Sequence, residues 1–177
     1  IMDKSILAVN KDSLERVLVK NPMIKSAQVY YSLDGYIHVN IQQREPVLRV
    51  LTGEGYYVDR DGRVMPLSSK FTSRVVVATG DINKKFACEK LGPFAMKLKN
   101  EPFWDAYIEQ LVVRSNEDVV MIPKVGDFRI VLGKVDDCDA RLEKLILFLK
   151  DGITKKGWNR YKEINLKFDN QVVCVRK

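Results

Sequence analysis

Residues 26–42 alternate apolar and polar side chains with the period of two that is typical of a half-buried β-strand. The alternation runs on both sides of the turn sequence Asp34-Gly35, with apolar residues at Ala27, Val29, Tyr31, Ile37, Val39 and Ile41. An Asp-Gly pair between two alternating segments favours a tight turn with matching strand twist. We therefore expect a β-hairpin with one buried face.

A short amphipathic helix is expected before this hairpin, over residues 12–20. The segment Asp12-Ser13-Leu14-Glu15 has the spacing of a capping box, and Leu18 lies on the same helical face as Leu14. Pro22 ends the helix, because proline restricts the preceding residue to extended geometry.

The sequence Arg44-Glu45-Pro46 marks a boundary between two parts of the chain, residues 1–46 and residues 47–177. Proline has no N–H to donate to a strand ladder, so a continuous strand is not expected through it. One helix and one hairpin bury little apolar surface. Residues 1–46 are therefore either an incomplete unit or a unit that packs against the second part of the chain.

The second part is predicted to be rich in short strands with helices between them. We expect strands at residues 47–51, 55–59, 63–66, 73–78, 111–114, 118–122, 128–132, 163–168 and 171–175. Helices are expected at residues 83–91, 101–110 and 136–149. The predicted fold class is α+β, with a helix-plus-hairpin unit followed by a mostly antiparallel β domain and flanking helices.

Composition excludes several classes of protein. The chain of 177 residues is 46% hydrophobic and 30% charged, which is globular rather than disordered composition. Its most apolar run, residues 145–149, is far shorter than the roughly 20 residues that span a bilayer. The three cysteines, Cys88, Cys138 and Cys174, are far apart and form no C-x-x-C pair, so we expect buried or half-buried thiols.

The candidate catalytic and metal-binding patterns are weak. His38 is the only histidine and lies on the polar side of a predicted strand, so every triad that needs histidine would depend on it. Asp59-Arg60-Asp61-Gly62 begins like a calcium loop but lacks the later ligands, which favours a hairpin turn. We therefore expect no catalytic residue, no metal and no cofactor.

A net charge of +7 and a pI near 9.3 make nucleic acid or an anionic surface a possible partner class. Two aromatic residues, Trp158 and Tyr161, lie within a basic stretch that contains Lys155, Lys156, Arg160 and Lys162. Aromatic rings next to cations can stack on the bases of single-stranded nucleic acid. Large rings between a helix and a strand more often close the edge of a core, and we favour that interpretation.

The end of the chain is informative in a different way. Gln171-Val172-Val173-Cys174-Val175 is an alternating apolar segment without a polar tail. If it lies at the edge of a sheet, its unpaired N–H and C=O groups can receive a strand from a partner. If it is an interior strand it recruits nothing, and these two alternatives are equally supported by the sequence.

The order and spacing of several segments resemble the FtsQ (DivIB) family of bacterial cell-division proteins from about residue 7 to the end. In the first part they are Asn21-Pro22, the hairpin strands and Arg44-Glu45-Pro46, which resemble the second half of a POTRA domain. In the second part they are Tyr57-Val58-Asp59 with Gly62, Leu132-Gly133, the helix around Arg141-Leu142, Glu163 to Phe168 and Gln171 to Val173.

This resemblance implies a partial POTRA domain at residues 1–46 and an FtsQ-type β domain at residues 47–177. It further implies a short cytoplasmic tail and one transmembrane helix before residue 1, with this region on the periplasmic side of the inner membrane at the division septum. The implied role is a non-enzymatic scaffold that binds FtsB-like and FtsL-like partners and acts through them on the septal synthase FtsW with FtsI.

In the family, FtsB adds a strand to the last strand of the β domain. Carried over by position, this implies partner contacts at Phe168, Asn170, Gln171, Val172, Val173, Cys174, Val175 and Arg176, within an edge strand at residues 171–176. Arg176 stands where some members have a tryptophan, and Asn165 and Lys167 replace an aspartate and an arginine of the family motif. Two other classes remain open: a nucleic-acid-binding module, and a POTRA-bearing protein of outer-membrane assembly or secretion.

Overall fold

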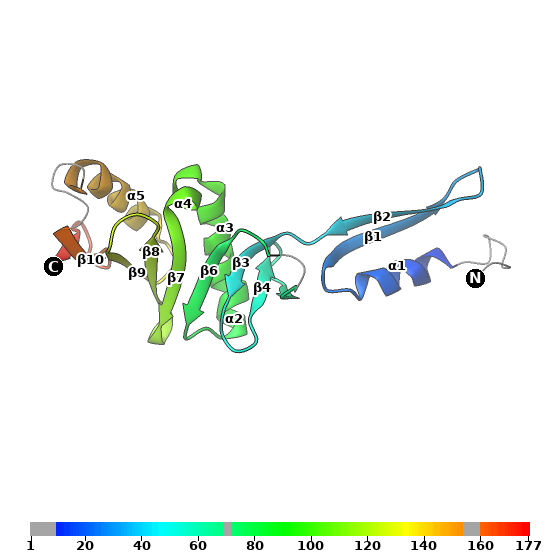
Figure 1. The fold of residues 1–177 in the computed structure, drawn as a ribbon, viewed down its shortest axis with the longest axis horizontal. Helices are drawn as coiled ribbons and strands as arrows, with labels where there is room; N and C mark the ends of the chain where they lie inside the picture. Colours follow the sequence, from blue (N-terminus) through cyan, green and yellow to red (C-terminus); the bar gives the residue numbers. More distant parts are fainter. Residues whose placement is uncertain (1–9, 69–71, 154–159) are drawn as a thin grey trace. The chain divides into compact units, whose positions relative to one another are not determined.

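The computed structural model of the chain describes residues 10–68, 72–153 and 160–177, and it divides into two compact units, residues 1–45 and 46–177 (Figure 1). Trp158, Lys155 and Lys156 lie outside the described residues. Of the helices in the described part, none is long and apolar enough to cross a membrane.

The first unit consists of helix α1 (Lys11–Val19) and an antiparallel hairpin of β1 (Ile24–Tyr31) and β2 (Ile37–Gln43). The predicted helix and hairpin are confirmed, but the helix begins one residue earlier than expected. Its N-cap is Asn10, whose Oδ1 accepts from the N–H of Ser13 at 3.1 Å. Glu15 has a different role from the predicted capping box, because its carboxylate accepts from the N–H of Val29 at 2.7 Å.

Apolar burial in the first unit is small. Among its described residues only Ala27 and Val29 are buried, both on β1, and β2 is exposed along nearly its whole length. His38 lies on β2, where its ring stacks on Tyr30 with 5.0 Å between ring centroids. His38 is therefore a solvent-exposed strand residue, as predicted.

The second unit is built on a nine-stranded sheet with the strand order β11-β10-β9-β8-β7-β6-β3-β4-β5. The strands in chain order are β3 (Pro46–Val50), β4 (Tyr56–Asp59), β5 (Val64–Pro66), β6 (Val76–Gly80), β7 (Ile108–Arg114), β8 (Asp118–Pro123), β9 (Arg129–Gly133), β10 (Tyr161–Asn165) and β11 (Val173–Arg176). Most neighbours are antiparallel, and the parallel pairs are β3 with β6, β6 with β7, and β9 with β10. The predicted α+β fold with a mostly antiparallel sheet is confirmed.

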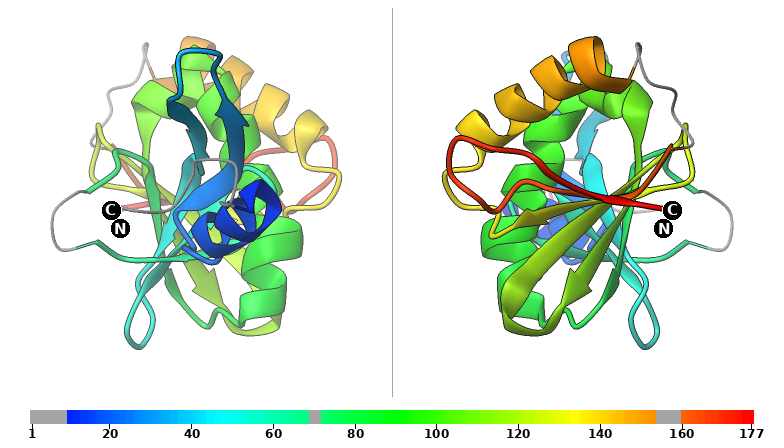
Figure 2. Two further views of the ribbon diagram at one scale, coloured as in Figure 1. Left: turned by 90° about the vertical axis from the view of Figure 1, so that its right-hand side faces the viewer. Right: turned by 90° about the vertical axis from the view of Figure 1, so that its left-hand side faces the viewer.

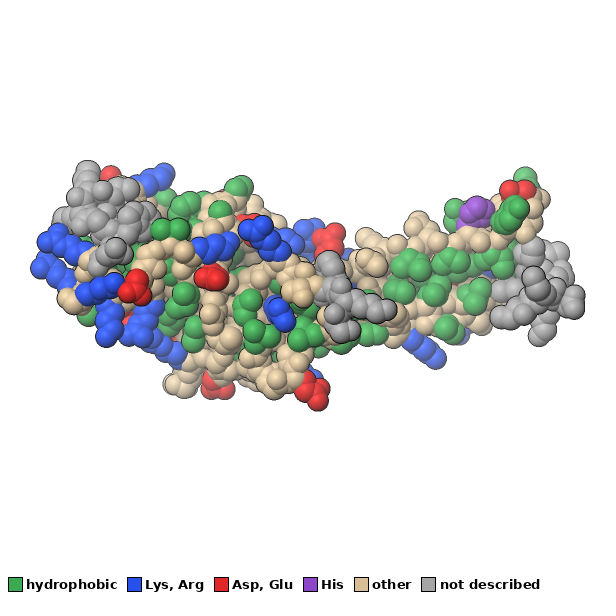
Figure 3. Space-filling view, viewed as in Figure 1, with side chains coloured by type: hydrophobic (Ala, Val, Ile, Leu, Met, Phe, Trp, Pro, Cys, Tyr) green, Lys and Arg blue, Asp and Glu red, His purple; other side chains and the backbone are tan. Residues whose placement is uncertain are grey.

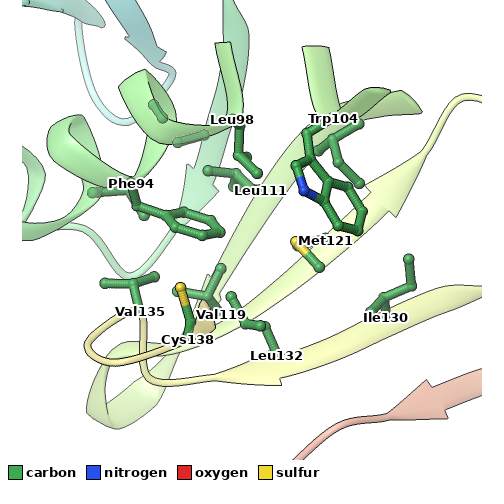
Figure 4. Packing of buried hydrophobic residues seen from close by; sticks show 14 of the residues in the cluster. Phe94, Leu98, Trp104, Leu111, Val119, Met121, Ile130, Leu132, Val135 and Cys138 are labelled. Carbon is green, nitrogen blue, oxygen red and sulfur yellow. The ribbon is translucent and has the colours of Figure 1, made fainter. Parts of the chain in front are cut away.

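One face of this sheet carries the hydrophobic core. Residues in register across seven strands form a row on that face: Val50, Ala78, Leu111, Met121, Ile130, Ile164 and Cys174. Helices α2 (Lys84–Phe86), α3 (Gly92–Asn100), α4 (Pro102–Tyr107) and α5 (Asp139–Phe148) lie on the same side of the sheet (Figure 2). Figure 4 shows Phe94 and Leu98 of α3 and Trp104 of α4 packed over Leu111, Met121 and their neighbours.

One helix lies outside the predicted ranges, and another is shorter than predicted. Residues 92–100 form α3, which follows directly on a π-helical segment at Ala87–Leu91. The N–H of Gly92 donates to the carbonyl of Ala87 across this π-helical segment, just before Pro93, and Gly92 brings the helix against β4, since a Cβ there would lie 3.0 Å from Val58 Cγ1. The helix expected at residues 101–110 ends at Tyr107, and Ile108 already begins β7.

The turn between β4 and β5 is organised by Asp59, which is only 2% exposed. Its Oδ1 accepts from the N–H of Asp61 at 3.0 Å and from the N–H of Arg63 at 2.7 Å. Gly62 follows with a φ of 74°. The predicted hairpin turn at this segment is confirmed.

We expect Asp59→Ala to lower the free energy of unfolding of the second unit by about 1–3 kcal/mol, because two backbone N–H groups lose their acceptor. Asp59→Asn keeps an acceptor oxygen and should cost less. Urea denaturation followed by tryptophan fluorescence measures this, since both tryptophans, Trp104 and Trp158, belong to the second unit. Equal stability of Asp59→Ala and the wild type would contradict the role assigned to Asp59.

Candidate partner-binding edge

Among the described residues, strand β11 is the outermost strand at one end of the sheet and pairs with β10 alone. Its register is antiparallel, with Val173 opposite Asn165, Cys174 opposite Ile164, and Val175 opposite Glu163. The right-hand view of Figure 2 looks onto this end of the sheet, with the C-terminal segment (red) in front. Of the two alternatives that the sequence left open, the edge strand is therefore the observed one.

The strand is shorter than predicted, because β11 begins at Val173 rather than at residue 171. Asn170 has a left-handed φ of 57° and lies in the turn that follows β10. Gln171 and Val172 belong to the approach to the strand, and Val172 packs against the core. Strand β10 also ends earlier than predicted, at Asn165, so that Phe168 lies in the turn.

The outward-facing backbone groups of β11 follow from the hydrogen bonds of its neighbours. The N–H of Leu166 donates to the carbonyl of Val131 on β9, and the N–H of Lys177 donates to the carbonyl of Arg160. Because backbone groups of alternate residues point to opposite sides of a strand, Val173 and Val175 bond to β10. The N–H and C=O groups of Cys174 and Arg176 therefore point away from the sheet.

Side chains on β11 alternate between the core and the opposite face. Cys174 packs against the core, whereas Val173 and Val175 are 37% and 48% exposed. A second in-register row lies on the face of the sheet opposite the core, and Val173 is its last residue. The row consists of Val112, Val120, Val131, Asn165 and Val173. Phe168 in the preceding turn is 47% exposed. The edge therefore offers apolar side chains next to backbone groups that point away from the sheet.

The opposite end of the sheet differs from this edge. Strand β5 has three residues and ends in Pro66, which has no N–H. Short edge strands and proline are common protections against strand addition. Strand β11 has neither a proline nor a bulge of its own among the described residues, since the irregularity in its pairing falls between Tyr161 and Glu163 of β10.

Cationic side chains gather around β10 and β11 (Figure 3). The exposed cations on these strands and their neighbours are Arg129, Arg160, Lys162, Arg176 and Lys177. Arg129 Nε pairs with Glu163 Oε2 at 2.9 Å, and Lys177 Nζ pairs with Asp127 Oδ2 at 2.7 Å, which lowers the pKa of Asp127. Cations outnumber acids here, so the surface favours an acidic partner.

The ring of Tyr161 is part of the core rather than a stacking platform. Tyr161 is 9% exposed, and its ring lies 5.9 Å from that of Phe148 between centroids. The core-edge interpretation is therefore confirmed for Tyr161, whereas Trp158 lies outside the described residues.

The cysteines do not favour nucleophilic chemistry. Cys138 is buried, Cys88 and Cys174 are half-buried, and all three are free. Burial raises the pKa of each thiol, and for Cys88 the nearby Asp59 adds to the effect. A raised pKa lowers the thiolate fraction at neutral pH. Within the described residues no group of three or more His, Cys, Asp or Glu side chains could hold a metal ion.

The alternation indicated a C-terminal strand and the family resemblance implied that it is an edge strand, but the alternation alone left edge and interior positions open and could not show which N–H groups point outward. That information depends on the register between β9, β10 and β11. The resemblance is confirmed by comparison with protein families. The family described as FtsQ/DivIB, C-terminal related, matches residues 45–175, and a POTRA-like domain matches residues 1–42. No curated protein matches the chain.

Proposed function

Since the chain belongs to the FtsQ/DivIB C-terminal related family of membrane-anchored, non-enzymatic scaffolds of the division site, we propose that β11 receives a strand from an FtsB-like division protein. The family has a role in bacterial cell division.

The observation that carries the proposal is the open edge of β11. Its Cys174 and Arg176 backbone groups point away from β10, and the other end of the sheet is closed to addition by the short strand β5 with Pro66. Strand addition gains affinity from main-chain hydrogen bonds and specificity from side chains at alternate positions. On β11 the exposed side chains at alternate positions are Val173 and Val175, and the exposed ring of Phe168 lies in the preceding turn.

The charge of this surface defines the partner segment further. Arg160, Lys162 and Arg176 are exposed around the edge, so a segment with acidic residues beside its apolar strand is favoured. In the proposed role, an FtsL-like protein joins the complex with the FtsB-like protein. The complex then helps to control the septal synthase FtsW with FtsI, on the periplasmic side of the inner membrane at the septum.

The test is a titration of the full chain with the soluble segment of an FtsB-like protein, followed by fluorescence anisotropy. We expect saturable one-to-one binding that weakens several-fold when salt rises from about 50 to about 300 mM, because the cationic edge is screened. A single-stranded oligonucleotide in the same buffer serves as the matched control for the nucleic-acid alternative. Absence of partner binding at about 100 μM, or tighter binding of the oligonucleotide, would contradict the proposal.

A further inference from the structure

A side chain from outside the sheet bonds to the turn between β10 and β11. Lys144, in the middle of α5, donates from Nζ to the carbonyl oxygen of Phe168 at 2.6 Å and lies 3.5 Å from the carbonyl oxygen of Leu166. An ammonium donor makes a charge-assisted bond, which is roughly twice as strong as a neutral one. Phe168 is also the exposed ring beside the proposed docking edge.

Among the described residues, two further bonds connect this segment to the sheet: the N–H of Leu166 donates to the carbonyl of Val131 on β9, and Lys167 Nζ donates to Asp118 Oδ1 on β8 at 3.0 Å. The N–H of Lys167 donates to Asn165 Oδ1 at 3.0 Å, before the turn proper. Residues 169 and 170 form the tight part of the turn, and Asn170 has a left-handed φ. The bonds of Leu166 and Lys167 fix the end of β10 to the sheet, whereas the bond from Lys144 Nζ is made to Phe168 itself and connects it to a helix of the core. The position of Phe168 relative to the helices therefore depends on Lys144.

Helix α5 is packed against the core, and this packing holds Lys144 in place for its bond to the turn. Leu142 and Leu145, on either side of Lys144, are 4% and 0% exposed and belong to the core. Arg141 adds two bonds to a different segment, to the carbonyls of Leu132 and Asp136, both at 2.7 Å. The position of α5, and with it the backbone of Lys144, is thus held by contacts that do not involve the β10–β11 turn.

We infer that Lys144 is a positioning residue for partner binding, which acts by fixing the turn that presents Phe168 and begins β11. This inference rests on the proposed function of the β11 edge. A residue of α5 thereby fixes the point at which the docking strand begins. Helix α5 packs on the core face of the sheet, whereas the row that ends in Val173 lies on the opposite face. Lys144 does not itself touch the partner strand.

The first measurement is hydrogen exchange of the full chain without any partner. In Lys144→Met, the amides of Val173 and Val175 should exchange about fivefold faster or more, because the turn that begins β11 is loosened. Lys144→Arg retains a cationic donor and should restore slow exchange. Lys85→Met makes the same chemical change at an exposed lysine of α2 and should leave these amides unaffected.

The second measurement is binding of the FtsB-like segment to the same variants. We expect about fivefold weaker binding for Lys144→Met, recovery within about twofold for Lys144→Arg, and no change for Lys85→Met. The urea midpoint of Lys144→Met should stay close to that of the wild type. Unchanged exchange, or faster exchange with unchanged binding, would overturn the inference.

The two measurements separate this inference from the proposed function. If the wild type fails to bind the segment, the proposed function fails, and exchange alone then decides whether Lys144 holds the turn. If Lys144→Arg is as defective as Lys144→Met in both measurements, a donor at this position is not what matters and the inference fails.

Discussion

Replacing Arg176 by proline is expected to weaken binding of an FtsB-like strand by about tenfold or more while the second unit stays folded. The N–H of Arg176 points away from β10, so proline removes a donor that only a partner strand uses. The partner's carbonyl then loses its hydrogen bond within the interface, which costs about 1–3 kcal/mol. Titration by anisotropy measures the loss, and urea denaturation checks the fold.

Two matched variants separate the backbone effect from the side-chain effect. Arg176→Ala removes the cation but keeps the N–H, so it should weaken binding only a few-fold and mainly at low salt. Val173→Pro removes an N–H that bonds to Asn165 on β10, so it should destabilise the unit as well as abolish binding. Equal affinities of Arg176→Pro and Arg176→Ala would show that no strand pairs with this edge.

The hairpins and strands of this protein were largely predictable because period-two alternation and turn residues act locally. Asp34-Gly35 and Asp59-Arg60-Asp61-Gly62 both form turns between paired strands, as their residue types favour. The order of the strands in the sheet was not predictable from alternation. It depends on parallel pairings such as β3 with β6, which bring together residues far apart in the chain.

Helix predictions failed where packing overrides local preference. Gly92-Pro93 would end most helices, but here glycine lets α3 approach Val58, and a π-helical segment at Ala87–Leu91 lies just before the proline. Residues 108–110 continue a plausible helical pattern, yet Ile108 enters β7 because its neighbours on β8 offer a ladder. Tertiary pairing of this kind decides between helix and strand when local propensities are similar.

The candidate site was predictable in outline but not in detail. The alternation of residues 171–175 and the family resemblance indicated the C-terminal strand, yet the strand begins only at Val173, which pairs with Asn165 at the end of β10. Lys144 carried no signal in the sequence, since a lysine on a helix is most often solvated. Its bond to Phe168 appears only when α5 and the turn are brought together.

The largest stability effect is expected at Gly80, the last residue of β6. Gly80 has a φ of 104°, and a Cβ built on it would lie 2.0 Å from the carbonyl oxygen of Val113. That oxygen is fixed, because it accepts from the N–H of Asp81 at 2.9 Å. Gly80→Ala should therefore lower the free energy of unfolding of the second unit by about 3 kcal/mol or more.

Gly53 provides the control that separates backbone strain from the clash. It also has a positive φ, 58°, but nothing lies within 4 Å of a Cβ built on it. Gly53→Ala should cost only the left-handed conformation, about 1–2 kcal/mol. Urea denaturation by tryptophan fluorescence compares the two variants directly. If both lose the same stability, the parallel β6–β7 pair moves to admit a methyl group, and the close approach of Gly80 to Val113 does not limit the fold.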